Sequence, residues 1–235
     1  MCKIIQLEWD SNFFDYEVGK LYIPKNGHFE ISVLPENEFK LIYLFSEEPL
    51  SDHKLKSLGA QLVDVKVELA KSTAIMPLNF NDKNTYEVKP INELSNSLIS
   101  LVLESGVYSR FKLDQNFIQN EYERLYIAWI KKALEETNSK VYGAYLDTQL
   151  LGFISLSMKS GIADIGLIAV YEKARGMHIG KILLHEANNY ANNNDSSAIT
   201  VVTQEKNEQA MAFYIKNGFS VQNKTYTYHL WKKNQ

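Results

Sequence analysis

The spacing of apolar positions divides the chain into strand-like and helix-like segments. In its first part, apolar and β-branched runs predict four strands and one short helix. The strands are expected at residues 4–7, 18–23, 40–45 and 62–69. The helix is expected at residues 51–58, because the glycine that follows it, Gly59, favours a helix end. This pattern predicts a small α/β unit.

Strands and helices alternate more regularly after residue 85. The predicted order is strand, helix, helix, three strands, helix, strand, helix and strand. The first six elements are expected at residues 86–88, 91–104, 116–136, 141–146, 150–158 and 162–170. An amphipathic helix, a strand at 197–203, a helix that stops at Asn217-Gly218 and a strand at 219–231 follow. Pro, Asn and Asp gather at residues 76–83, which predicts a boundary between domains at 1–80 and 85–235.

Composition and charge exclude several classes of function. The chain has 235 residues, of which 45% are hydrophobic and 12% aromatic, so it is expected to be globular. A net charge of −3 and a pI near 6.0 do not favour a nucleic-acid partner. No apolar run reaches the roughly 18 residues of a membrane span. The single cysteine, Cys2, and the lack of a signal-peptide pattern predict a cytoplasmic setting.

The most specific signal lies between the strand at 162–170 and the helix that follows it. Glycine stands at the second and sixth positions of the run Arg-Gly-Met-His-Ile-Gly at 175–180. Unpaired backbone N–H groups and the positive end of a helix dipole converge at such a turn. We therefore predict a phosphate or pyrophosphate site formed by Arg175, Gly176, Met177, His178, Ile179, Gly180 and Lys181.

The flanking residues exclude two common nucleotide sites. A P-loop needs Ser or Thr after its lysine, but Ile182 follows Gly180-Lys181. A Rossmann fingerprint needs a third glycine in phase, which is absent. The remaining pattern resembles the pyrophosphate loop of GCN5-related N-acetyltransferases (GNAT), with His178 at a position that is usually glycine. We expect the backbone of His178 to stay near the right-handed helical region.

A second motif downstream strengthens this resemblance. Asn207, Ala210, Phe213 and Tyr214 fall on one face of a helix, and Gly218-Phe219 follows it. This order is similar to the closing motif of GNAT enzymes. The resemblance implies the GNAT acyltransferase fold, an α/β fold with a mixed sheet, after a small N-terminal α/β domain. It also implies acyl-CoA as co-substrate and no metal. The co-substrate contacts are expected from the loop, from Asn207 and Phe213, and from the main chain of Ile168, Ala169 and Val170.

A narrower resemblance concerns the acceptor. Residues 7–14 (Leu-Glu-Trp-Asp-Ser-Asn-Phe-Phe) and residues 109–117 look like segments of enzymes that acylate dTDP-linked amino-dideoxyhexoses, the dTDP-fucosamine acetyltransferase-like group. The resemblance implies transfer of an acetyl or short hydroxyacyl group to a 3- or 4-amino group of such a sugar, for lipopolysaccharide or O-antigen synthesis. The acceptor-binding residues it implies are Trp9, Ser109, Arg110 and Phe111. A homodimer is left open.

Those residues also have simpler explanations. Trp9 is as well suited to packing in a core or an interface as to stacking on a sugar ring. Arg110 is predicted on a loop, where it could pair with a diphosphate oxygen or with Asp114 four residues on.

Amide formation from a thioester needs a neutral amine, a stabilised oxyanion and a proton for the thiolate. Tyr214 is our candidate general acid, with a packed structural tyrosine as the alternative. Asp164 is the candidate general base, because histone-type GNAT enzymes place a glutamate there; a solvated edge carboxylate is the alternative. His178, His185 and solvent are other candidates for the base. Without a bulge, positions 164, 166, 168 and 170 would share one face of the strand.

Two competing functions follow from the same residues. The chain could be a GNAT enzyme for another amine, such as a peptide, a polyamine or an aminoglycoside. It could also be a non-catalytic acyl-CoA-binding module that retains the fold. An acidic acceptor pocket would indicate a polycationic acceptor.

Overall fold

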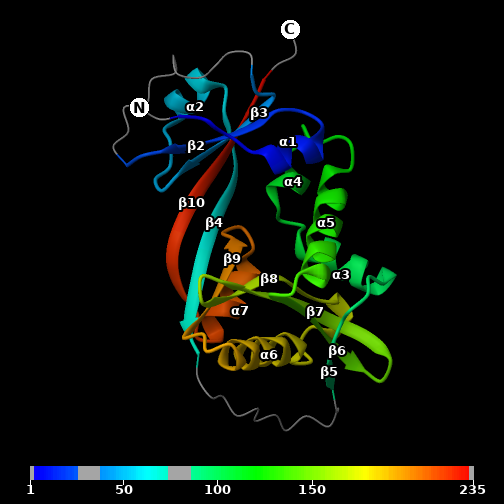
Figure 1. Cartoon of the computed structure of the whole chain (residues 1–235). Coiled ribbons are helices and arrows are strands. Elements are labelled where there is room, and N and C mark those ends of the chain that lie inside the picture. The colour runs from blue at the N-terminus through cyan, green and yellow to red at the C-terminus, as the bar shows by residue number, and fades with distance from the viewer. Residues whose placement is uncertain (1–2, 26–37, 74–85, 233–235) are drawn as a thin grey trace. The chain divides into compact units, whose positions relative to one another are not determined.

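The computed structural model describes residues 3–25, 38–73 and 86–232. The predicted boundary segment at 76–83 lies outside these residues. The chain divides into two compact units, and the strands β4 (Gln61–Ser72) and β10 (Ser220–Trp231) contribute to both of them. Figure 1 labels the elements. None of the described helices is long and apolar enough to cross a membrane.

The first unit is a small sheet with two short helices. Its strand order is β1-β2-β3-β10, with β2 parallel to β3 and β3 antiparallel to β10. The elements are β1 (Ile5–Gln6), α1 (Glu8–Phe14), β2 (Val18–Ile23), β3 (Leu41–Ser46) and α2 (Asp52–Leu58). Alternate residues of these strands build the core on one face, which contains Leu21, Ile23, Ile42, Leu44, Leu58 and Tyr228.

Local sequence explains where the helices of this unit begin and end. Ser51 caps α2 by accepting a hydrogen bond from the backbone N–H of Lys54, and Gly59 ends the helix at φ 67°. Helix α1 was not predicted from the sequence. Its aromatic run lacks a side-chain cap, but Phe14 is buried and Ser11 accepts the N–H of Val18, so packing holds the helix.

The second unit contains the phosphate loop. Its strand order is β4-β9-β8-β7-β6-β5, and only part of β4 belongs to this unit. Strands β8 and β9 are parallel. Its strands are β5 (Glu87–Pro90), β6 (Ser139–Leu146), β7 (Gln149–Lys159), β8 (Ile162–Val170) and β9 (Ala198–Gln204). Its helices are α3 (Asn96–Ser105), α4 (Arg110–Leu113), α5 (Glu121–Glu135), α6 (Ile179–Asn193) and α7 (Glu208–Lys216).

Helices cover both faces of the strands β6–β8 in this unit. Figure 1 shows α3 and α5 on one face and α6 on the opposite face. The amphipathic pattern of α6 buries Ile179, Ile182, Leu183, Leu184 and Ala187. The element order and the mixed sheet confirm the predicted α/β fold class.

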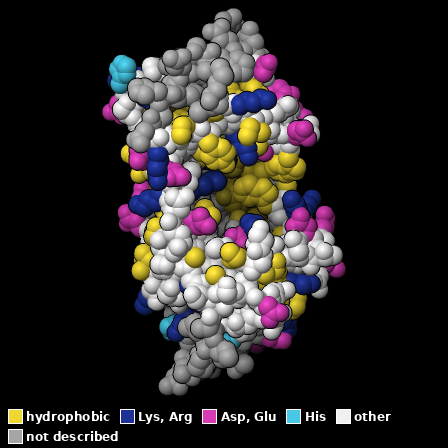
Figure 2. All heavy atoms as spheres, turned by 60° about the vertical axis from the view of Figure 1, so that its left-hand side comes forward, with side chains coloured by type: hydrophobic (Ala, Val, Ile, Leu, Met, Phe, Trp, Pro, Cys, Tyr) yellow, Lys and Arg dark blue, Asp and Glu magenta, His cyan; other side chains and the backbone are white. Residues whose placement is uncertain are grey.

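Two differences from the sequence prediction concern boundaries. The C-terminal part of β10, from Asn223 onward, belongs to the first unit, because residues 226–231 pair with β3. The segment Arg110–Leu113 was predicted as loop but forms the one-turn helix α4. Its cap is Ser109, whose hydroxyl accepts the N–H of Phe111. On the face drawn in Figure 2, basic and acidic side chains of the described residues lie interspersed.

Candidate active site

The phosphate loop has the main-chain geometry of an anion site. Gly176 lies at φ 80°, in the left-handed region that favours glycine. Helix α6 then begins at Ile179, and the N–H groups of Lys181 and Ile182 both donate to the carbonyl of His178. The N–H groups of Ile179 and Gly180 have no intrahelical acceptor, as is usual in the first turn. The turn therefore fits a pyrophosphate held by backbone donors.

The conformation of His178 differs from the prediction. We expected a right-handed backbone, but His178 lies at φ 59° and ψ 7°, in the left-handed region. The residue takes this conformation at the N-cap of α6. A side chain in this region costs about 1–2 kcal/mol, which glycine avoids. The family's usual glycine at this position therefore has a conformational cause, and His178 tolerates the strain.

Arg175 has a protein partner in this structure. Its Nη2 lies 2.5 Å from Oε1 of Glu104, which stands near the end of α3. The hydroxyl of Tyr171 also donates to the carbonyl of Ser97 on α3, at 2.8 Å. The segment before the loop is thus tied to α3 at two points. The Arg175 side chain remains partly exposed. To contact an anion at the loop, its guanidinium would either keep the ion pair with Glu104 and bind the anion as well, or break that ion pair.

Strand β8 separates from β9 next to this loop. Residues Ala163–Ile165 pair with Ile199–Val201, and the pairing ends there. On its other edge, β8 has a bulge against β7: Ile154 faces Ile168, but Leu156 faces Ile165. Two residues of β8, Gly166 and Leu167, therefore oppose the single residue Ser155. The gap beyond Ile165 leaves β8 backbone available to an amide-containing chain such as pantetheine.

The bulge changes which side chains share a face. Positions 164, 166, 168 and 170 were expected to share one face only in a strand without a bulge, and β8 has a bulge. Asp164 and Leu167 line the same cavity. Val170 instead lies beside Ile179 of α6, since a Cβ on Gly152 would meet both side chains at 3.1 Å. An extra residue in one strand shifts the alternation by one position.

Tyr214 is deeply buried on α7. Its side chain is 2% exposed, and its ring packs against Phe213 and Phe219. Burial raises the pKa of the phenol, so the hydroxyl stays protonated at neutral pH. Phe213 packs on Gly180, where a Cβ would lie 3.0 Å from the ring. The side chain of Asn207 caps α7 by accepting the N–H of Ala210 at 3.1 Å.

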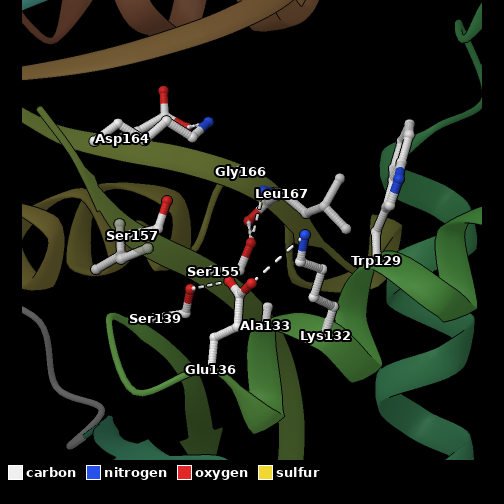
Figure 3. A pocket seen from close by; sticks show the side chains of 12 residues that line it. Trp129, Lys132, Ala133, Glu136, Ser139, Ser155, Ser157, Asp164, Gly166 and Leu167 are labelled. Carbon is white, nitrogen blue, oxygen red and sulfur yellow. Dashed lines mark hydrogen bonds and ion pairs between the residues drawn. The ribbon is translucent and has the colours of Figure 1, made fainter. Parts of the chain in front are cut away.

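A cavity of about 210 Å³ lies between α5 and the strands β7 and β8 (Figure 3). One wall is formed by α5, with Trp129, Lys132, Ala133 and Glu136. The strands supply Ser139, Ser155, Leu156, Ser157, Lys159, Asp164, Gly166 and Leu167. The bulge thus lies in the wall of the cavity. Helix α6 lies on the other face of the sheet, which separates His185 from this cavity.

Both carboxylates of the cavity are paired. Asp164, whose side chain is only 12% exposed, contacts Nζ of Lys159 at 2.5 Å through Oδ2 and accepts the hydroxyl of Thr200 at 3.0 Å through Oδ1. Glu136 contacts Lys132 at 3.5 Å and accepts the hydroxyl of Ser139. Asp164 is therefore a held carboxylate in a cavity wall and not a solvated residue of a sheet edge. Its role as a base stays a prediction.

The predicted acceptor residues lie in different places. Ser109, Arg110 and Phe111 are buried in the second unit, and the Arg110 guanidinium lies over the Phe111 ring at 4.5 Å. Phe111 also contacts Trp129 edge-on, with ring centroids 6.1 Å apart, and so supports the wall of the cavity. Trp9 lies on α1 in the first unit, is half exposed and stacks on Phe13 at 5.0 Å. Their contact with an acceptor stays a prediction.

Sequence reasoning missed the residues that close the cavity. Ser155 and Lys159 belong to no motif of the sequence. Ser155 and Ser157 are two polar residues in the otherwise apolar strand predicted at 150–158, and this is the local signal that the sequence offers. Among the described residues, no group of three or more His, Cys, Asp or Glu is placed to hold a metal ion.

Comparison with known proteins supports one family. The model of the acetyltransferase (GNAT) family matches residues 106–219. A spermidine N(1)-acetyltransferase from Thermoplasma acidophilum is 30% identical over 122 residues, which cover 50% of this chain and 73% of that protein.

Solved structures share the fold. A protein of Staphylococcus epidermidis superposes with a TM-score of 0.60 at 13% identity, covering 92% of this chain and 84% of that one. A GCN5-related N-acetyltransferase from Kribbella flavida gives a TM-score of 0.56 at 10% identity, covering 93% and 82%. The chain belongs to the GNAT family of acyl-CoA-dependent acetyltransferases.

Proposed function

We propose that this protein transfers an acyl group from acyl-CoA to the amino group of a dTDP-linked amino-dideoxyhexose. The cavity beside α5 would receive the sugar ring, and the gap beside β8 would receive the pantetheine arm. The phosphate loop at 175–181 would hold the CoA pyrophosphate through backbone N–H groups.

The chemistry needs only groups that this unit contains. The neutral amine attacks the thioester carbonyl, and a C–N bond forms while the carbonyl oxygen becomes an oxyanion. Backbone N–H groups of Ile168–Val170 stabilise that charge. The C–S bond then breaks, and Tyr214 donates its proton to the thiolate. Asp164 accepts the amine proton through water.

The charge of the cavity is the observation that carries the choice of acceptor. Each of its two carboxylates contacts a lysine, so Asp164 and Glu136 add no uncompensated negative charge. A polyamine carries several positive charges and is recognised by unpaired carboxylates. Three serines and the half-buried Trp129 provide hydroxyl groups and an aromatic surface, which suit a sugar ring. This environment favours a hydroxylated ring over a polycation.

The size of the cavity indicates which part of the acceptor enters it. Drug-sized ligands occupy about 300–1,000 Å³. A cavity of about 210 Å³ accommodates a single ring but not a complete nucleotide sugar. The dTDP portion would lie outside the cavity and supply binding energy that orients the amine.

A polyamine acceptor is the second candidate, because the relative from Thermoplasma acidophilum carries the name spermidine N(1)-acetyltransferase. The identity of 30% and the alignment over half of this chain support the shared family. They leave the acceptor to be decided by experiment.

A substrate panel tests the proposal. Purified protein is incubated with acetyl-CoA and a hydroxybutyryl-CoA, and free thiol is followed with dTDP-linked 3-amino and 4-amino sugars, the free amino sugars and spermidine. We expect kcat/KM for a dTDP-linked sugar to exceed that for its free sugar by about a hundredfold or more, because remote binding energy positions the amine. Product mass shows where the acyl group went.

Variants locate the acceptor in the cavity. Trp129→Leu should raise KM for the dTDP sugar and leave KM for acyl-CoA unchanged. Lys131→Met, an exposed change on the same helix, is the control. Comparable turnover of free sugar and nucleotide sugar, or faster turnover of spermidine, would overturn the sugar-nucleotide proposal.

A further inference from the structure

Ser155 joins two strands through its side chain at the point where their pairing is irregular. Its Oγ accepts the backbone N–H of Leu167 at 2.8 Å and donates to the carbonyl of the same residue at 3.4 Å. Ser155 is buried and lies on β7, whereas Leu167 lies on β8. A side chain thus replaces the main-chain partner that the bulge removes from the ladder.

Gly166 completes this arrangement from the other strand. A Cβ built on Gly166 would lie 2.9 Å from the Oγ of Ser155, which is closer than real Cβ atoms approach. The hydroxyl therefore occupies the space that a side chain at position 166 would need. Ser155 and Gly166 form one complementary pair across the two strands.

The bulge determines the course of β8 at the reaction centre. It brings Leu167 into the cavity wall, and it lies one residue after the last β8–β9 pair, Ile165 with Val201. Because the N–H of Leu167 is already bonded to Ser155, it is not available to an oxyanion. The donor must come from the main chain after the bulge, in Ile168–Val170.

We propose that Ser155 is a positioning residue for acyl transfer, which holds the bulge at Gly166–Leu167 and so aims the following N–H groups at the thioester carbonyl. The inference rests on the proposed function, in which β8 supplies the oxyanion donors. Oxyanion stabilisation depends on donors held within tenths of an ångström, and a misplacement of about 1 Å can cost a hundredfold in rate. Ser155 acts through β8 and need not touch the substrate.

Three substitutions on β7 test this role. Ser155→Ala should lower kcat by about tenfold to a hundredfold, while KM for acyl-CoA changes less than twofold, because the phosphate loop is untouched. Gln149→Ala, an exposed change on the same strand at a residue that does not line the cavity, should keep kcat. Ser155→Thr, which retains the hydroxyl, should recover most of the lost rate.

A measurement on β8 is independent of turnover. Amide hydrogen exchange of Leu167, followed by NMR in the whole chain, should speed up roughly threefold to tenfold in Ser155→Ala, as expected for the loss of one hydrogen bond. Gly166→Ala disturbs the same bulge from the other side and should show the same loss of kcat with acyl-CoA affinity retained. This variant tests the proposal even where Ser155→Ala folds poorly.

The outcomes that overturn the proposal are specific. Unchanged kcat in both Ser155→Ala and Gly166→Ala would show that the bulge does not position the donors. A rise in KM for acyl-CoA as large as the loss of kcat, or an equal loss of kcat in Gln149→Ala, would show a general disturbance of the strand. If no dTDP sugar is a substrate, the proposed acceptor is wrong. The role of Ser155 is then decided by comparing kcat of the same variants with any amine that the protein acylates.

Discussion

The phosphate loop and the cavity beside α5 lie in the same unit but are built from different groups. The loop presents main-chain N–H groups at the start of α6, and its glycines provide conformation and space. The cavity presents side chains from α5, β6, β7 and β8, and its charges are set by pairs such as Lys159 with Asp164. Changes in the cavity should therefore alter the chemical step or the KM for the acceptor, whereas changes in the loop should alter acyl-CoA affinity.

The largest expected effect is at the cavity. Asp164→Asn should lower kcat by about 10²–10⁴-fold if the carboxylate is the general base. KM for acyl-CoA should change little. The fold should persist, because the lysine left behind is exposed to solvent. Steady-state kinetics with varied acyl-CoA measure both constants, and Asp195→Asn in an exposed turn is the control. A kcat within twofold of the original would assign proton removal to solvent.

Tyr214→Phe should have the next largest effect. The proton is needed only as the C–S bond breaks, so kcat should fall by about 10², the low end for acid catalysis, with both KM values retained. Tyr190→Phe, which loses a hydroxyl bonded to the carbonyl of Asn138, is a structural control with reduced stability and normal kcat. A reduced melting temperature with normal kcat for Tyr214→Phe would make this tyrosine structural too.

The pH profile provides a further check on Tyr214. Burial raises the pKa of its phenol above the usual value of 10.0. The protonated acid is therefore fully present below that value, and kcat should show no decline from this residue between about pH 7 and 9. A fall in kcat over this pH range that is absent in Tyr214→Phe would show that the phenol of Tyr214 loses its proton there, which would contradict its raised pKa.

A smaller effect is expected at the loop arginine. Arg175→Ala should raise KM for acyl-CoA about tenfold, because a charge-assisted contact contributes roughly 1.5–3 kcal/mol, and kcat should stay near normal. Glu104→Gln removes the partner seen at 2.5 Å and should lower KM or leave it unchanged. Calorimetric titration with CoA measures both variants. Normal affinity in Arg175→Ala would show that main chain alone binds the pyrophosphate.

The smallest effect is expected at His178. His178→Gly removes left-handed strain but increases the freedom of the unfolded chain, so stability should rise by less than about 1 kcal/mol. KM for acyl-CoA should not change, because this position offers main chain only. Urea unfolding and binding on one preparation test this, and a severalfold rise in KM would show that the imidazole contacts the co-substrate.

Local patterns were sufficient for much of the fold. The strand at 18–23 and the helix end at Gly59 were predicted because periodicity and helix-end signals act over a few residues. Helix α1 was missed, since it has no side-chain cap and depends on buried Phe14 and Ser11. The one-turn helix α4 was too short to leave a periodic signal.

By itself, the sequence determined the family, the glycine-containing turn at 175–180 and the closing helix with Asn207 and Tyr214. These depend on main-chain conformation and helical spacing, which are written in consecutive residues. Only the tertiary structure decided the bulge opposite Ser155, the pairing of Asp164 with Lys159, and the bond between Arg175 and Glu104. Such contacts join different elements of the chain, and the energy of a side chain there depends on partners that no local pattern specifies.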